Sequence, residues 1–188
     1  MNWEKIEILN QDGEKVDAQA PIIISASRST DIPAFYADWF VERWKKGYIR
    51  WNNPFNGVPL YVSFNKARVV VFWTKNPKPM IKHLPFLKEH VKNFYFQYTL
   101  NDYDNEGYEK NVPPLDHRIK TFIELSEQIG KKHIIWRFDP MMLTDKIDVA
   151  TLLNRVKNIG DQLQNYTNKL VFSFADITIY NKVANNLK

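Results

Sequence analysis

The stretch Ile22-Ile23-Ile24-Ser25-Ala26-Ser27-Arg28-Ser29-Thr30-Asp31 decides the fold. It begins as a short apolar run of β-branched residues, continues into a polar segment and leads into a helical pattern. Runs of this kind are typical of strands that are buried on both faces of a parallel sheet. Four later runs have the same character, at residues 69–73, 94–98, 134–138 and 170–174. The sequence therefore predicts five parallel strands.

Helical patterns fill the intervals between these runs. Apolar residues recur at steps of three and four over 35–44, 80–87, 119–129 and 149–163, and we interpret these stripes as core packing. Alternating strands and helices favour either a doubly wound sheet or a (β/α) barrel. No G-x-G-x-x-G follows the first strand. The sequence therefore favours an α/β fold with a parallel (β/α) repeat, a partial TIM-like barrel of about five strands.

Two segments depart from this repeat. Residues 1–20 predict an N-terminal hairpin, because Ile6 and Ile8 alternate with polar residues and Asp12-Gly13 is a hairpin-type turn. Residues 48–66 predict an inserted hairpin or loop. No linker or low-complexity tract interrupts the chain, so residues 1–188 are expected to form a single (β/α) domain.

Composition excludes several classes of site. The chain has no cysteine, which excludes disulfides, thiolate zinc sites, a cysteine nucleophile and a cysteine-ligated iron–sulfur cluster within these residues. The four histidines are scattered, and no metal site is expected. A formal charge of +5 favours an anionic small molecule and gives weaker support to nucleic acid. The absence of a long apolar run and of a signal peptide predicts a cytoplasmic protein without membrane contact.

Polar residues cluster where the predicted strands end. The chemistry of parallel α/β folds is located at the carboxyl ends of the strands. The candidate substrate- or cofactor-binding residues are therefore the polar residues of these segments: Arg28, Thr30, Asp31, Lys75, Asn76, Gln97, Arg137 and Asp139. No P-loop and no nucleophile elbow accompanies them, so catalytic residues cannot be assigned from the sequence.

Arg137 is the most informative of these candidates, since it interrupts an apolar run. A guanidinium in such surroundings requires a carboxylate or an anionic ligand. A structural pair with Asp139 or Asp31 and a ligand clamp both satisfy that requirement. Lys75 is a further candidate for an anion contact, because it ends the second strand of the repeat.

Five ordered blocks carry a resemblance to a known family; they are residues 23–36, 53–56, 71–77, 96–100 and 136–140. The sequence resembles a bacterial family described as domain of unknown function 1848. That resemblance implies a radical S-adenosylmethionine-like protein with a barrel-like fold. It also implies S-adenosylmethionine and a [4Fe–4S] cluster in full-length members, with the cluster held by cysteines near the C-terminus.

The resemblance and the missing cysteines lead to three hypotheses. The chain is the front portion of a radical S-adenosylmethionine-like barrel enzyme of unknown substrate, inactive without the cysteine segment; in that case no cofactor is expected in this chain. Alternatively, it is a module that binds an anion, a nucleotide or nucleic acid without catalysis. A truncation without activity of its own is the third hypothesis.

An open sheet of five strands would leave two edges unpaired. We also expect an aromatic patch on its open face, built from Trp73, Tyr98, Trp136 and Phe174. Such surfaces predict a homo-oligomer that forms through the open edge.

Overall fold

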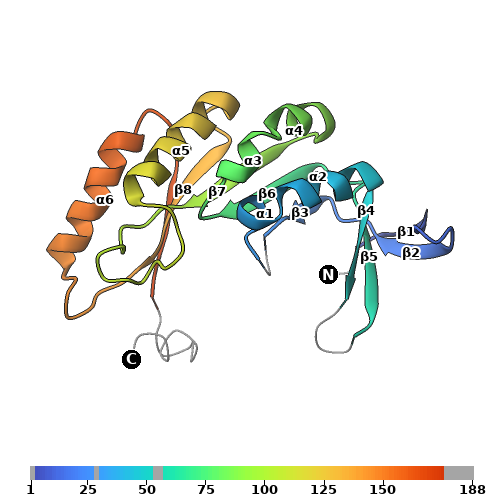
Figure 1. Cartoon of the computed structure of the whole chain (residues 1–188), viewed down its shortest axis with the longest axis horizontal. Helices are drawn as coiled ribbons and strands as arrows, with labels where there is room; N and C mark the ends of the chain where they lie inside the picture. Colours follow the sequence, from blue (N-terminus) through green and yellow to red (C-terminus); the bar gives the residue numbers. More distant parts are fainter. Residues whose placement is uncertain (1–2, 28–29, 53–56, 176–188) are drawn as a thin grey trace. The chain divides into compact units, whose positions relative to one another are not determined.

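The structure, a computed structural model, describes residues 3–27, 30–52 and 57–175. The chain divides into two compact units, Met1–Gln97 and Tyr98–Lys188, here called unit 1 and unit 2 (Figure 1). No described helix is both long and apolar enough to cross a membrane.

Five strands form the parallel sheet that the apolar runs predict. They are β3 (Ile23–Ser25), β6 (Val69–Thr74), β7 (Phe94–Thr99), β8 (Ile134–Met141) and β9 (Leu170–Phe174). Their order in the sheet is β3-β6-β7-β8-β9, which follows the order of the chain without a reversal. The predicted α/β class and the parallel strands are confirmed. Within the described residues the sheet is open, with β3 and β9 at its edges.

Unit 1 contains a second, smaller sheet. It is built from β1 (Lys5–Leu9), β2 (Lys15–Gln19), β4 (Tyr48–Asn52) and β5 (Pro59–Ser63), in the order β1-β2-β5-β4. The pairs β1/β2 and β4/β5 are antiparallel hairpins within 1–20 and 48–66. The sequence does not indicate that β2 and β5 pair in parallel and join the two hairpins into one sheet.

The described part of unit 1 contains four helices: α1 (Ile32–Phe35), α2 (Ala37–Lys46), α3 (Lys78–Ile81) and α4 (Leu84–His90). The backbone of Tyr36, with φ −135° and ψ 30°, separates α1 from α2. Helix α2 ends at Gly47, whose φ of 79° places it in the left-handed region, where a glycine cap is favoured.

The break at Tyr36 corrects one expectation. The aromatic stripe of 35–44 was interpreted as core packing, but only part of it is buried. Phe40 is 3% exposed and packs edge-on against Phe72 with ring centroids 5.1 Å apart. Trp39 is 40% exposed and Phe35 is 71% exposed. The stripe predicts one continuous helix, whereas Phe35 lies on the separate helix α1. Trp39 and Phe40 are neighbours within α2 and therefore point in directions about 100° apart around its axis.

Unit 2 packs α5 (Leu115–Ile129) and α6 (Val149–Leu163) on one face of its strands. Side chains of β8 alternate between faces, so Trp136 and Phe138 are buried while Arg137 and Asp139 are only partly buried. Tyr98 stacks on Phe122 of α5 with ring centroids 5.4 Å apart. The predicted open-face patch is therefore wrong for Tyr98 and Trp136, which are 0% and 4% exposed.

Candidate functional site

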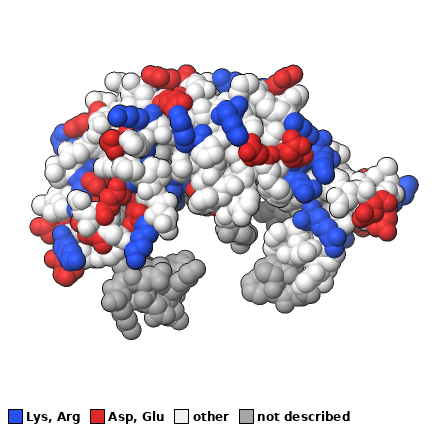
Figure 2. Space-filling model, in the orientation of Figure 1, with Lys and Arg blue, Asp and Glu red and all other residues white. Residues whose placement is uncertain are grey.

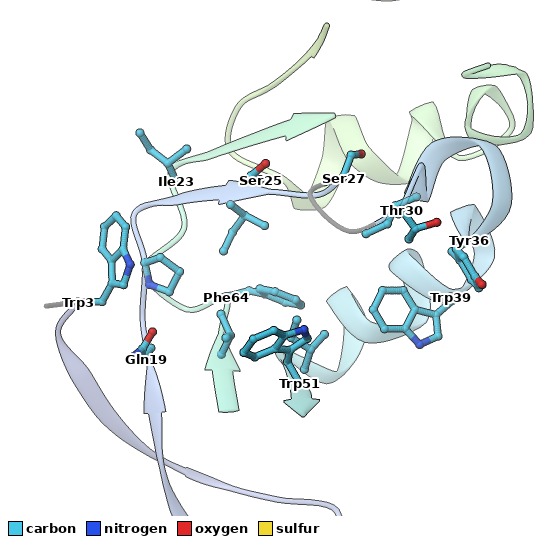
Figure 3. Close-up of a pocket in the computed structure, with 15 residues that line it drawn as sticks. Trp3, Gln19, Ile23, Ser25, Ser27, Thr30, Tyr36, Trp39, Trp51 and Phe64 are labelled. Atoms are coloured by element: carbon cyan, nitrogen blue, oxygen red, sulfur yellow. The ribbon is translucent and has the colours of Figure 1, made fainter. Parts of the chain in front are cut away.

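A cavity of about 590 Å³ lies within unit 1 (Figure 3). It is bounded by β3 and the residues that follow it, by α1 and α2, and by one face of the smaller sheet. Aromatic side chains line much of it: Trp3, Tyr36, Trp39, Trp51 and Phe64. The exposure of Trp39 and Trp51, at 40% and 41%, follows from their position on this open cavity.

The strand pairing in the smaller sheet brings one row of cavity-lining residues to the same face of that sheet. Gln19 of β2 pairs with Val62 of β5, and Val62 pairs with Ile49 of β4. Residues that are directly opposite one another in a sheet point to the same face. Trp51 lies two residues beyond Ile49 and therefore shares that face. The parallel β2–β5 pairing, which the sequence does not indicate, thus builds this wall of the cavity.

Hydroxyl groups line the side of the cavity formed by β3 and the segment after it. Ser25, Ser27 and Thr30 all contribute to this side. The Ser27 hydroxyl donates to the carbonyl of Ala26 and accepts a hydrogen bond from the Trp73 amide at 3.2 Å, so it is held against β6. Among the described residues, none that lines the cavity carries a formal charge. The cavity is therefore an apolar, aromatic space with a few neutral polar groups.

Asp31 holds the turn between β3 and α1 in place. One carboxylate oxygen accepts the Ala34 amide at 3.0 Å as a helix cap, and the other accepts the Lys75 amide at 2.7 Å. The Thr74 hydroxyl also donates to this carboxylate. Burial raises the pKa of the Asp31 carboxyl above its usual value, and these hydrogen bonds oppose the shift only in part. Asp31 therefore connects the ends of two adjacent strands.

The other predicted residues of unit 1 lie near this turn or farther along the sheet. Lys75 follows β6, and its charge acts on the Asp31 carboxylate. Asn76 accepts the Lys78 amide at 3.2 Å through its side-chain oxygen, next to the start of α3. Gln97 is partly buried in β7. Thr30 is the one described member of the predicted set that lines the cavity. Arg28 lies outside the described residues.

Arg137 and Asp139 lie together in unit 2. The Arg137 guanidinium forms an ion pair with the Asp139 carboxylate, and the side chains are 14% and 23% exposed. Asp139 also accepts a hydrogen bond from the Ser173 hydroxyl of β9. Its backbone amide donates to the Asn101 side chain at 2.9 Å. Of the two roles considered for Arg137, the structure contains the pair with Asp139.

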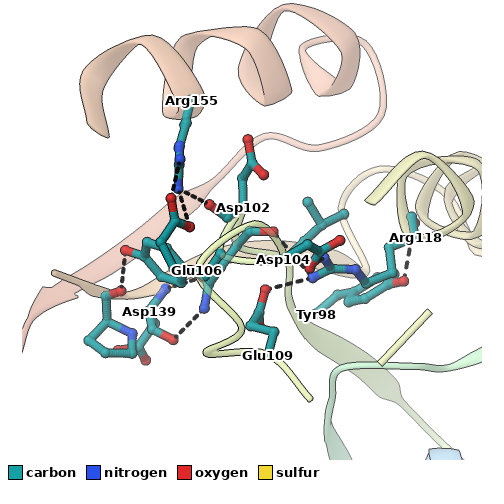
Figure 4. Close-up of polar contacts among 12 residues, drawn as sticks. Tyr98, Asp102, Asp104, Glu106, Glu109, Arg118, Asp139 and Arg155 are labelled. Atoms are coloured by element: carbon teal, nitrogen blue, oxygen red, sulfur yellow. Dashed lines mark hydrogen bonds and ion pairs between the residues drawn. The ribbon is translucent and has the colours of Figure 1, made fainter. Parts of the chain in front are cut away.

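Sequence reasoning missed a network of buried charges in unit 2 (Figure 4). Arg118 of α5 is 1% exposed, and it donates to Glu109 at 2.9 Å and to Asp104 at 2.6 Å. Arg155 of α6 donates to both carboxylate oxygens of Glu106, at 2.9 and 2.7 Å. The network attaches the loop between β7 and α5 to both helices. The sequence feature that could have revealed this network is a loop rich in acidic residues that is followed by two helices with one arginine each.

Tyr103 attaches the same loop to the end of β8. Its hydroxyl donates to the carbonyl of Pro140 at 2.9 Å and accepts the Met142 amide at 3.1 Å. Burial raises the pKa of Tyr103 to about 12, so the phenol is neutral and able to donate throughout the physiological range. These contacts give the loop a structural role.

The family resemblance implies two cofactors, and the residues of this chain do not suit both of them. A [4Fe–4S] cluster does not fit, because thiolates hold such clusters and these 188 residues include no cysteine. Within the described part of the chain, no group of three or more histidine and carboxylate side chains could hold a metal ion. The cavity suits the adenine ring of S-adenosylmethionine, but its described lining supplies no charged side chain for the amino acid part.

Comparison with known proteins places the chain in a family. A protein-family model for a domain of unknown function, DUF1848, matches residues 23–188. The match confirms the resemblance carried by the five sequence blocks. No protein among the curated sequences matches the chain, and no solved structure does.

Proposed function

Because the chain belongs to the DUF1848 family, whose function is unknown, we propose a function from the geometry of unit 1. Its cavity binds an uncharged small molecule that contains an aromatic ring. The observation that carries this proposal is a cavity of about 590 Å³ with aromatic walls and no charged side chain among its described lining residues.

The size of the cavity supports a small-molecule ligand. Small-molecule pockets in proteins have volumes of roughly 300 to 1,000 Å³ and are mostly apolar with a few polar groups. Stacking of a ring on an aromatic side chain contributes roughly 1–3 kcal/mol per ring, as measured for nucleic-acid bases. Three tryptophans, Trp3, Trp39 and Trp51, are available for such contacts.

The polar groups of the cavity favour a neutral ligand over an anion. Ser25, Ser27 and Thr30 offer hydroxyls, and Gln19 offers an amide. These groups can donate and accept hydrogen bonds but do not neutralise a charge. A nucleobase, a nucleoside or another neutral heterocycle matches this lining, whereas the described lining residues offer no cation to a desolvated phosphate.

Substitution of Trp51 tests the proposal with a matched control. Trp51 lines the cavity at 41% exposure, and Trp73 of unit 1 is 40% exposed outside the lining. Calorimetric titration with neutral heterocycles should show binding that is about tenfold or more weaker in Trp51→Ala, since one stacking contact is lost. Trp73→Ala should bind within about twofold of wild type. Equal losses in both variants, or no binding of any neutral heterocycle by wild type, would refute the proposal.

A second candidate is the radical-type enzyme. In this proposal the chain is the front portion of a radical S-adenosylmethionine-like enzyme, with the cavity as a substrate or cofactor site. Family membership and the sequential parallel sheet support it. The cluster would require thiolates from outside these 188 residues. Anaerobic reconstitution of the chain with iron and sulfide should therefore yield no cluster, and stoichiometric incorporation would contradict this account.

We also propose that the parallel sheet is part of a TIM-like barrel and that the protein acts in the cytoplasm.

We further propose that β9 mediates association with another chain. Three apolar side chains of this edge strand support association, because Leu170, Phe172 and Phe174 are 38%, 52% and 74% exposed. Association through this edge is independent of the ligand cavity, which lies in unit 1.

A further inference from the structure

We propose that unit 1 carries a second binding site, specific for a phosphate group, on the opposite face of its smaller sheet. The site is a depression of about 230 Å³. It is bounded by the β1–β2 turn, by α2 and by β4. The charged residues that line it are Arg43, Arg50 and Asp12. This site adjoins the aromatic cavity at Trp39 and Ile49, but its charged residues do not line that cavity and the site does not depend on the function proposed for it.

The location of Arg50 separates the two sites. Arg50 lies between Ile49 and Trp51 on β4, so its side chain points away from the face that lines the aromatic cavity. It pairs across the strands with Tyr61, which also lines the depression. Among the described lining residues, Trp39 and Ile49 alone contribute to both sites, which meet there.

The two arginines of the depression lack the carboxylate partners that the arginines of unit 2 have. Arg118, Arg137 and Arg155 of unit 2 each form an ion pair with a carboxylate. Within the described residues, the structure gives the side chain of neither Arg43 nor Arg50 a hydrogen bond or an ion pair. Arg43 lies over the Trp39 ring at 5.9 Å from its centroid, which holds the guanidinium at the rim by a cation–π contact.

Charge and size favour a phosphate monoester over a carboxylate. Two guanidiniums and the Asp12 carboxylate leave one net positive charge in the depression. A phosphate monoester carries a charge of about −1.5 to −2 at neutral pH and offers several acceptor oxygens. Arginine binds such groups through two parallel hydrogen bonds. Lys and Arg side chains also gather over α2 and β4 on the face shown in Figure 2, which raises the local positive potential.

The small volume favours the phosphate of a small molecule over a nucleic acid strand. The tilted rings of Tyr48 and Tyr61, with centroids 6.0 Å apart, lie beside the arginines. Their hydroxyls add neutral donors to the site. Exposed Gln11 of the β1–β2 turn contributes an amide on the opposite side.

The test is an NMR titration of the full chain with inorganic phosphate at low ionic strength, with acetate in a parallel arm. Phosphate should produce saturable shifts in the backbone amides of residues 10–12, 48–50 and 61. Arg50→Ala should weaken this binding about tenfold or more, since a charge-assisted contact is lost. Asp12→Asn should tighten it, because the opposing negative charge is removed. Lys92→Ala removes an exposed positive charge elsewhere in unit 1 and should leave the binding unchanged.

Three results would overturn the inference. Absence of saturable shifts would show that no site exists. Equal weakening by Arg50→Ala and Lys92→Ala would reveal only non-specific charge attraction. Acetate binding as tight as phosphate binding would contradict the proposed ligand class. None of these results bears on the aromatic cavity, because Arg50, Asp12 and Lys92 are not among its lining residues.

Discussion

At the scale of single residues, Asp31 shows how one carboxylate organises a strand-to-helix turn. Three donors converge on it, from Ala34, Lys75 and Thr74. The sequence indicated Asp31 as a candidate binding residue, and in the structure its side chain caps α1. Position in the sequence could not reveal the contact with Lys75, which lies 44 residues away and reaches Asp31 only because β3 and β6 pair.

Substitution of Asp31 should destabilise the protein. Asp31→Ala leaves two backbone amides without their acceptor, so the free energy of unfolding should fall by about 1–2 kcal/mol in urea denaturation. The folded-state pKa is raised, so the stabilising contribution of Asp31 is greatest below its unfolded pKa and is lost as pH rises through the folded value. The difference in free energy of unfolding between wild type and variant should therefore be larger at acidic pH. A gap that widens toward neutral pH would contradict the direction of the shift.

Arg118 is a buried charge that forms an ion pair with a second buried charge. Glu109 has a side chain that is 2% exposed and depends on Arg118 for its ion pair. Arg118→Ala should lower the free energy of unfolding by about 3–5 kcal/mol, the range for breaking a buried ion pair by removal of one partner. Lys120 of the same helix forms only an exposed ion pair with Asp116, and Lys120→Ala should cost no more than about 0.5 kcal/mol. Similar losses in both variants would argue against a buried network.

At the scale of elements, the apolar runs predicted all five strands of the parallel sheet, because strands buried on both faces have a strong local signal. The walls of the aromatic cavity had no such signal. They depend on the β2–β5 pairing between residues 43 positions apart and on the break of the helix at Tyr36. Trp39 was therefore assigned to the core from its spacing alone. The prediction that Trp136 lies on the open face of the sheet was wrong for a similar reason, since periodicity does not show which face of a sheet the helices cover.

Two glycines should respond in opposite directions to replacement by alanine. Gly47 caps α2 with φ 79°, and an added Cβ would meet only Asn65 at 3.7 Å, so the cost is one of backbone conformation. Gly47→Ala should destabilise by about 1–2 kcal/mol. Gly160 lies inside α6, where a Cβ would make ordinary contact with Trp136 at 3.5 Å. Gly160→Ala should stabilise by about 0.4–1 kcal/mol. Thermal denaturation measures the change in Tm of both variants. Changes in Tm of the same sign would contradict the backbone conformations assigned to the two glycines.

At the scale of the whole molecule, the open sheet predicts association through β9. Phe172 and Phe174 of that strand are exposed, and edge strands of this kind pair with other chains. Light scattering should detect a concentration-dependent dimer that Phe172→Lys reduces, because a charged side chain on an edge opposes pairing. A monomer at high micromolar concentration would contradict this prediction.

The central claim is that unit 1 binds a neutral, ring-containing molecule in its aromatic cavity. The most direct measurement is the set of intermolecular nuclear Overhauser contacts between a bound neutral heterocycle, such as adenosine, and the tryptophan indoles. We predict contacts from the ring protons to Trp39 and Trp51, which line the cavity, and none to Trp136, which is buried in unit 2. A bound heterocycle that contacts neither Trp39 nor Trp51 would contradict the account.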